Sequence, residues 1–424
     1  MKIENNRLLI QKRTFPEFLT YTIFIMPFLL SFLQDTLNLP SFVKYIIDVA
    51  WVGILFSLLF VRKAFIKREI TPLLTIMLAF FLLTLTVYLF NFQSPFYYLW
   101  GIRNNFRFYV AFIAFTVFFT VEDIRFCLKL TDFLFWINAV VVLFQFFVMG
   151  LQQDYLGGIF GVERGCNGSL IVFFMIVATR SVLSYFNKRE SMLSCFSKCA
   201  VILVISAMAE LKFFFIVFII IVVMASVVTK FSWRKVLVYI FSAFLIMLGS
   251  SILVEVFGEN RSLDFDNLLD LIFSSNYSSS RDLGRFTALP TLSKFYLTEP
   301  IEKIFGLGLG NCDTSAFAIC NSTFFREHSF LNYTWFSSAF LFLETGYLGL
   351  TVFLLFFVVC FVLAHKKRRL KKGNEFFCQM AMIMSVMCVI LTFYNSSLRS
   401  EAGYMAYFVL ALPFVQQTTE PDKL

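Results

Sequence analysis

Residues 347–372 read YLGLTVFLLFFVVCFVLAHKKRRLKK. The first part, 347–364, contains no charged residue and is close to the roughly 20 apolar residues that a helix needs to cross the hydrocarbon core of a membrane. The second part, 366–372, is a run of Lys and Arg, and such residues concentrate in cytoplasmic loops. The stretch therefore predicts a transmembrane helix that ends at the cytoplasmic face.

The same apolar pattern recurs along the whole chain. Of its 424 residues, 59% are hydrophobic and 15% charged, whereas a soluble domain has about half its residues apolar and a quarter charged. This composition excludes a soluble fold. We expect an all-α, polytopic membrane protein in which residues 1–424 form a single integral membrane domain with about 12 transmembrane helices. The expected spans are 19–33, 42–61, 71–90, 108–121, 133–148, 169–186, 192–209, 213–229, 236–256, 347–364, 376–394 and 402–414.

The basic residues predict the orientation of these spans. Lys and Arg precede the first span and follow the second, fourth, sixth, eighth and tenth, so both termini are expected in the cytoplasm, with the protein in an inner membrane. The basic residues behind the net charge of +9 concentrate in these cytoplasmic segments. The charge therefore does not indicate nucleic acid binding, and we expect no nucleic acid partner. Residues 192–229 must form a hairpin that turns at Glu210-Leu211-Lys212, because one long helix would export the basic run at 366–372.

The longest polar segment is the loop 257–330. Nine spans precede it, so it is expected on the outer, periplasmic face, as a large external loop with short helices. It contains Cys312 and Cys320, and a disulfide between them is open, since their separation in sequence alone does not establish one. No Cys and His spacing indicates a metal site, and we expect neither a metal nor a cofactor.

Cations on the outer face are candidates for binding an anionic substrate. The candidates are Arg103, Arg107, Arg164, Lys212, Arg281 and Arg285. Arg103 and Arg107 are four residues apart, hence on one helical face, where two guanidiniums would grip a phosphate or diphosphate through forked hydrogen bonds. Arg281 and Arg285 repeat this spacing in the loop. The alternative for each is an interfacial anchor that snorkels or pairs with a nearby acid.

The loop and its C-terminal edge also hold turn glycines and two candidate bases. Gly306, Gly308 and Gly310 permit a tight turn with exposed N–H groups, which can cradle an anion. No βαβ context supports a dinucleotide motif. His328 is a candidate base, because an imidazole can accept a proton from a sugar hydroxyl. Glu344, in an apolar setting just before the tenth span, would suit a general base near neutral pH. A structural role is the alternative for both.

The order of these motifs resembles the large outer loop of the O-antigen polymerase and O-antigen ligase superfamily. The resemblance is carried by Gly284-Arg285, Phe305-Gly306-Leu307-Gly308, His328-Ser329 and FLETGYLGL at 342–350. Three earlier stretches are similar to that superfamily too: GGIFG at 157–161, Asn167-Gly168 and Glu210-Leu211-Lys212.

The resemblance implies a metal-independent membrane glycosyltransferase of the GT-C-like type, acting outside on sugars carried by undecaprenyl diphosphate. The product would be O-antigen, capsule or exopolysaccharide of the cell envelope. The outer cations would stabilise the departing diphosphate, and Glu344 or His328 would deprotonate the attacking hydroxyl. The implied partners are the lipid-linked glycan, membrane lipid and other polysaccharide-assembly proteins.

Two other functions stay open. An O-antigen ligase typically has its Gly-x-x-Gly step nine residues after a His-Asn or His-Ser pair, whereas Ser329 and Gly346 lie farther apart, which favours the polymerase. A lipid-linked oligosaccharide flippase or ion-coupled transporter would place charges at mid-membrane. The candidates for such charges, Asp48 and Asp132, are near span ends.

Overall fold

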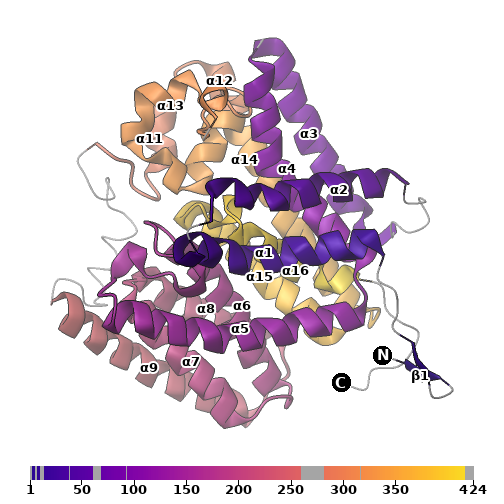
Figure 1. The fold of residues 1–424 in the computed structure, drawn as a ribbon, viewed down its shortest axis with the longest axis vertical. Helices are drawn as coiled ribbons and strands as arrows, with labels where there is room; N and C mark the ends of the chain where they lie inside the picture. Colours follow the sequence, from indigo (N-terminus) through magenta and orange to yellow (C-terminus); the bar gives the residue numbers. More distant parts are fainter. Residues whose placement is uncertain are drawn as a thin grey trace.

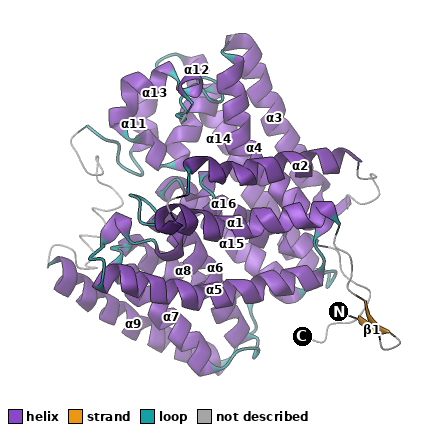
Figure 2. Cartoon of the chain, in the orientation of Figure 1, coloured by secondary structure: helices purple, strands orange, loops and turns teal. Residues whose placement is uncertain are grey.

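The computed structural model describes residues 2–4, 7–9, 14–37, 39–60, 68–91, 93–258, 281–315 and 317–415. Figure 2 shows that these residues are almost entirely helical. In these ranges the only strands are β1 (Lys2–Glu4) and β2 (Arg7–Leu9), which pair as an antiparallel hairpin. The expectation of an all-helical architecture is therefore confirmed for the membrane part of the chain.

A helix lies at each of the expected spans. These helices are α1 (Phe15–Leu37), α2 (Ile46–Phe60), α3 (Thr71–Asn91), α4 (Pro95–Phe118), α5 (Val121–Phe147), α6 (Asn167–Phe186), α7 (Met192–Met208), α8 (Lys212–Val228), α9 (Trp233–Phe257), α14 (Ser337–Arg369), α15 (Glu375–Tyr394) and α16 (Ala402–Ala411). Eight helical segments in the described ranges are long and apolar enough to cross a membrane, so the chain is a multi-pass helical membrane protein. Because α7, α8 and α16 are shorter and α4 carries two arginines, a total of about twelve spans stays a prediction.

Burial separates the central helices from the peripheral ones. The apolar windows of α6 and α15 are 83% and 78% buried, whereas those of α3 and α9 are each 28% buried. A helix that is apolar all round is stable either inside a bundle or against lipid. Figure 1 accordingly shows α15 and α16 near the centre, with α3 and α9 toward opposite edges.

The hairpin predicted within 192–229 is confirmed. The chain leaves α7 at Met208 and enters α8 at Lys212. Glu210 adopts the left-handed region with φ 54°, and the Leu211 N–H donates to the Ser206 carbonyl at 2.8 Å. A left-handed residue after a helix reverses the chain sharply, so Glu210 and Lys212 lie at the tip of a turn.

Helix α14 is kinked at Gly346, whose φ is 63°. A kink breaks the regular hydrogen-bond ladder of a helix. Next to this kink, the Leu343 and Glu344 carbonyls accept hydrogen bonds from the Leu307 and Gly308 N–H groups, at 2.8 and 3.0 Å. The turn glycines of the loop therefore dock on the kinked helix.

The part of the polar loop that the structure describes carries the expected short helices, α11 (Ala288–Phe295), α12 (Pro300–Phe305) and α13 (Thr323–His328). They gather at one corner of the molecule, beside the start of α14 (Figure 1). Residues 259–280 lie outside the described residues. Cys312 and Cys320 are both buried free thiols, so no disulfide joins them, and burial raises the pKa of Cys312 well above its ordinary value.

We predict that Gly346→Ala destabilises the protein more than Gly150→Ala does. Both glycines have nearly the same positive φ, 63° and 67°, which costs an L-residue about 1–2 kcal/mol. A Cβ at 346 would also lie 2.3 Å from the Ile304 backbone, whereas a Cβ at 150 meets nothing within 4 Å. Thermal unfolding in detergent measures the difference, and equal shifts of the two midpoints would contradict the docking.

Candidate functional site

Two cavities lie on either side of the connection 395–401, which joins α15 to α16. Ser400 lines one cavity and Glu401 lines the other. The connection is anchored at both sides: the Asn395 carbonyl accepts from the Ser337 N–H at 3.0 Å, and the Ser397 hydroxyl donates to the Gly168 carbonyl at 2.8 Å. A short polar link between two apolar helices thus forms a wall of both cavities.

The first cavity, here named the arginine cavity, has a volume of about 330 Å³. Its walls combine two arginines, two carboxylates and several neutral donors and acceptors. The polar and aromatic lining residues are Arg164, Arg285, Asp154, Glu210, Asn167, Asn395, Ser169, Ser396, Ser397, Ser400, Trp335, Phe336 and Tyr394. The size is near the lower end for a small-molecule site.

Two of the predicted cations, Arg164 and Arg285, reach this cavity from separate loops. The Arg285 guanidinium lies 4.3 Å from the centre of the Tyr394 ring, and the residue is 8% exposed. The Arg164 guanidinium lies 5.3 Å from the Trp335 ring, and its Nε is 3.9 Å from a carboxylate oxygen of Asp154. Stacking on aromatic rings orients both guanidiniums, while Arg164 stays 60% exposed.

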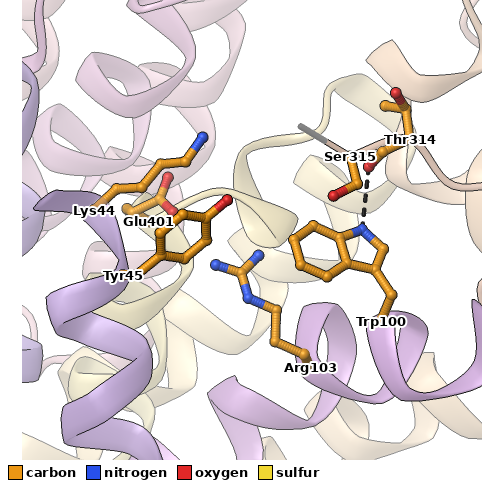
Figure 3. Close-up of a pocket in the computed structure, with 7 residues that line it drawn as sticks. All are labelled: Lys44, Tyr45, Trp100, Arg103, Thr314, Ser315 and Glu401. Carbon is orange, nitrogen blue, oxygen red and sulfur yellow. Dashed lines mark hydrogen bonds between the residues drawn. The ribbon is translucent and has the colours of Figure 1, made fainter. Parts of the chain in front are cut away.

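The second cavity, here named the tryptophan cavity, has a volume of about 310 Å³ and is lined by Lys44, Tyr45, Trp100, Arg103, Thr314, Ser315 and Glu401. Figure 3 shows Tyr45 and Trp100 on opposite sides, with the Arg103 guanidinium between them. The Trp100 indole N–H donates to the Thr314 carbonyl at 3.1 Å. This hydrogen bond, drawn dashed in Figure 3, ties α4 to the polar loop.

Arg103 and Arg107 share α4, as expected, but each already has a carboxylate partner. Arg103 donates to both oxygens of Asp48, at 2.9 and 2.7 Å. Arg107 is 3% exposed, contacts Glu401 at 3.3 Å and donates to the Arg399 carbonyl at 2.8 Å. The two guanidiniums therefore do not form one clamp for a diphosphate.

A third buried pair joins the polar loop to the 395–401 connection. Arg399 lies 3.6 Å from Asp313, with side-chain exposures of 12% and 6%. Asn104 of α4 donates to the same Asp313 carboxylate at 2.6 Å. Burial lowers the pKa of Arg399, and Asp313 opposes that shift. Burial is the largest influence on the pKa of Glu401 and would raise it, but Arg107, a backbone hydrogen bond and Arg103 together hold the pKa below its ordinary value.

Sequence reasoning had not selected Asp48, Asp313, Arg399 or Glu401 as site residues. Their signal in the sequence is weak, because Asp48, Arg399 and Glu401 are charges near the ends of apolar segments and Asp313 is one of many charges in the polar loop. Only the fold brings these residues next to arginines from α4 and from the connection.

Glu344, the second candidate base, is enclosed by the protein and does not open onto either cavity. It is 0% exposed and accepts hydrogen bonds from the Gly310 N–H at 2.9 Å and the Cys312 N–H at 3.3 Å. Gly306, Gly308 and Gly310 do form a turn with positive φ, but their N–H groups donate to the protein. The Gly310 N–H of this turn binds the Glu344 side chain through Oε1, so the turn holds a carboxyl group of the protein itself.

His328 and Arg281 lie away from both cavities. The His328 ring packs against Phe324 and Tyr296, with centroids 4.6 and 5.3 Å apart, and approaches Glu327 at 4.0 Å. Arg281 is exposed at the start of a described segment. Lys212 begins α8 next to Glu210 and Leu211, which line the arginine cavity. Among the described residues, no group of three or more His, Cys, Asp and Glu could hold a metal.

We predict that Asp313→Asn lowers the free energy of unfolding by about 3–5 kcal/mol, because it leaves Arg399 buried without a counter-charge. The matched control is Asp154→Asn. The ion pair of Asp154 with Arg164 is exposed by 42% and 60%, and an exposed pair contributes at most about 1 kcal/mol. Chemical denaturation in detergent measures the free energy of unfolding of both variants. An equal loss in Asp154→Asn and Asp313→Asn would contradict the buried pairing.

No family model matches the chain, and no curated protein matches it. The superfamily resemblance therefore stays an expectation carried by the motifs quoted above. Asn167, Glu210 and Arg285, which come from three of those motifs, line one cavity.

Proposed function

We propose that the protein is a polysaccharide polymerase. It would join undecaprenyl-diphosphate-linked oligosaccharide repeat units on the outer face of a bacterial cytoplasmic membrane. The observation that carries the proposal is the arginine cavity, where Arg164 and Arg285 meet beside serines, asparagines and aromatic rings. This lining suits a ligand that is anionic at one end and rich in hydroxyls at the other.

A diphosphate suits this cavity because a guanidinium presents a planar fork of donors that matches phosphate oxygens. Arg285 is buried by its stacking on Tyr394, and a charge in such a setting acts more strongly than one in water. The Arg164 side chain is 60% exposed, so it can meet a ligand that enters from solvent. Sugar hydroxyls would find partners in Asn167, Asn395 and the four serines.

The proposed reaction moves one glycan from its lipid diphosphate to a second lipid-linked glycan. A hydroxyl oxygen of the acceptor attacks the anomeric carbon of the donor, and a new glycosidic C–O bond forms. The bond from that carbon to the diphosphate oxygen breaks, and the leaving group departs with the electron pair. Arg164 and Arg285 would offset the charge that grows on the diphosphate, as electrostatic catalysis requires.

The hydroxyl proton needs an acceptor within reach of the same cavity. Glu210, at the tip of the α7–α8 turn, lines the cavity, and we assign the base to its carboxylate. Glu344 and His328 line neither cavity. Within this proposal Glu344 is a positioning residue, because it holds the backbone of the loop that carries Gly310 and Cys312.

We predict that Arg285→Ala and Arg164→Ala each reduce polymer formation by about 100-fold or more, the loss that follows removal of one stabilising donor at a reacting oxygen. The control is Arg326→Ala. Arg326 is an exposed arginine of α13 that donates to the Asn321 carbonyl at 3.4 Å and lines neither cavity. The readout is a glycan gel from cells that depend on the variant, with the amount of protein in the membrane measured beside it.

Polymer of normal length in both arginine variants would contradict the proposal. Deletion of the protein provides the second test, since cells that lack a polymerase carry single repeat units on the final acceptor. Full-length polymer stranded on the lipid carrier would identify a ligase instead.

A further inference from the structure

The tryptophan cavity is separate from the site proposed for the diphosphate, and its chemistry differs. We propose that it binds a sugar residue that carries a carboxylate, such as a uronic acid within the glycan. The inference deepens the proposed function, because it names a class of glycan that the protein would select.

Two aromatic side chains supply the part of the cavity that suits a sugar ring. Tyr45 and Trp100 lie on opposite sides of it (Figure 3). The Arg103 guanidinium covers part of the Trp100 ring, 4.8 Å from its centroid, and the remaining apolar surface of the two rings can contact the C–H face of a pyranose. Thr314 and Ser315 add hydroxyl groups to one wall. Such a mixture of apolar faces and a few polar groups is typical of small-molecule sites.

The charges around the cavity cancel except at Lys44. The charge of Arg103 is neutralised by Asp48, whose two carboxylate oxygens accept hydrogen bonds from the guanidinium. Glu401 is neutralised by Arg107 at 3.3 Å. The Lys44 ammonium lies 5.6 Å from the Tyr45 ring, and no carboxylate of the described residues is in ion-pair contact with it. The surplus at this cavity is therefore one positive charge.

One ammonium in a cavity that is also lined by the Glu401 carboxylate suits a singly charged carboxylate better than a doubly charged phosphate group. Phosphates are recognised best by the forked donors of arginine, and the fork of Arg103 is occupied by Asp48. The ammonium of a lysine is a compact point charge with three rotatable donors. These donors can bind the two oxygens of one carboxylate. Glu401, held ionised by Arg107, can accept hydrogen bonds from hydroxyls at the uncharged end of the same sugar.

The test uses the full chain in lipid nanodiscs and ligand-observed NMR, with methyl β-D-glucuronide and methyl β-D-glucoside as probes. We expect the wild type to bind the glucuronide at least tenfold more tightly than the glucoside. Lys44→Gln should remove this preference, while the neutral ring contacts stay in place. The matched control is Lys294→Gln, since the Lys294 ammonium also lies over the ring of the next residue, 5.0 Å from Phe295, but outside both cavities.

Three results would overturn the inference. They are equal or absent binding of the two sugars by the wild type, a glucuronide preference that survives Lys44→Gln, and displacement of the glucuronide by an equal concentration of inorganic phosphate. The polymerisation assay of the arginine variants is read independently. Glucuronide binding that depends on Lys44 would stand even if those variants still made polymer.

Discussion

A carboxylate removed from water must be given hydrogen-bond donors, and in this protein the donors come from a loop. Glu344 is fully buried in the segment of α14 before the kink at Gly346. The N–H groups of Gly310 and Cys312 bind its side chain, and those of Leu307 and Gly308 bind the α14 backbone. A buried polar group without a hydrogen bond costs free energy, so the docked loop and the helix stabilise each other.

This docking explains where the two cavities lie. The loop held by Glu344 brings Asp313 to Arg399 and the Thr314 carbonyl to the Trp100 indole. The buried pair between Asp313 and Arg399 then holds the 395–401 connection beside α4. Because breaking such a pair leaves a charge stranded, the connection has a defined position. Both cavities use it as a wall.

The sequence predicted the helices well because an apolar helix has the same hydropathy signal whether lipid or protein surrounds it. The turn at Glu210 followed from the basic run at 366–372, which constrains the number of crossings. The kink at Gly346 could not be predicted in this way, since a glycine in an apolar stretch fits a straight helix equally well. The structure shows why a glycine stands there, since the backbone of Ile304, far away in the sequence, leaves no room for a Cβ.

The site residues were predicted unevenly for a related reason. Residue type and side of the membrane were enough to select Arg164 and Arg285, which line one cavity. They also selected Arg103 and Arg107, whose partners Asp48 and Glu401 lie on other helices or connections. Whether a cation faces a ligand or a neighbouring acid depends on pairing in three dimensions. The apolar context of Glu344 indicated an unusual carboxylate, but not that backbone amides would enclose it.

The shared wall at 395–401 has a thermodynamic consequence. Ser400 and Glu401 are adjacent in sequence and face different cavities, so a ligand that shifts this connection in one cavity reshapes the other. Any resulting change in affinity must be reciprocal, because the coupling free energy is the same whichever ligand binds first. A chain with two such cavities would then sense the occupancy of both through a single peptide segment, without any movement of its long helices.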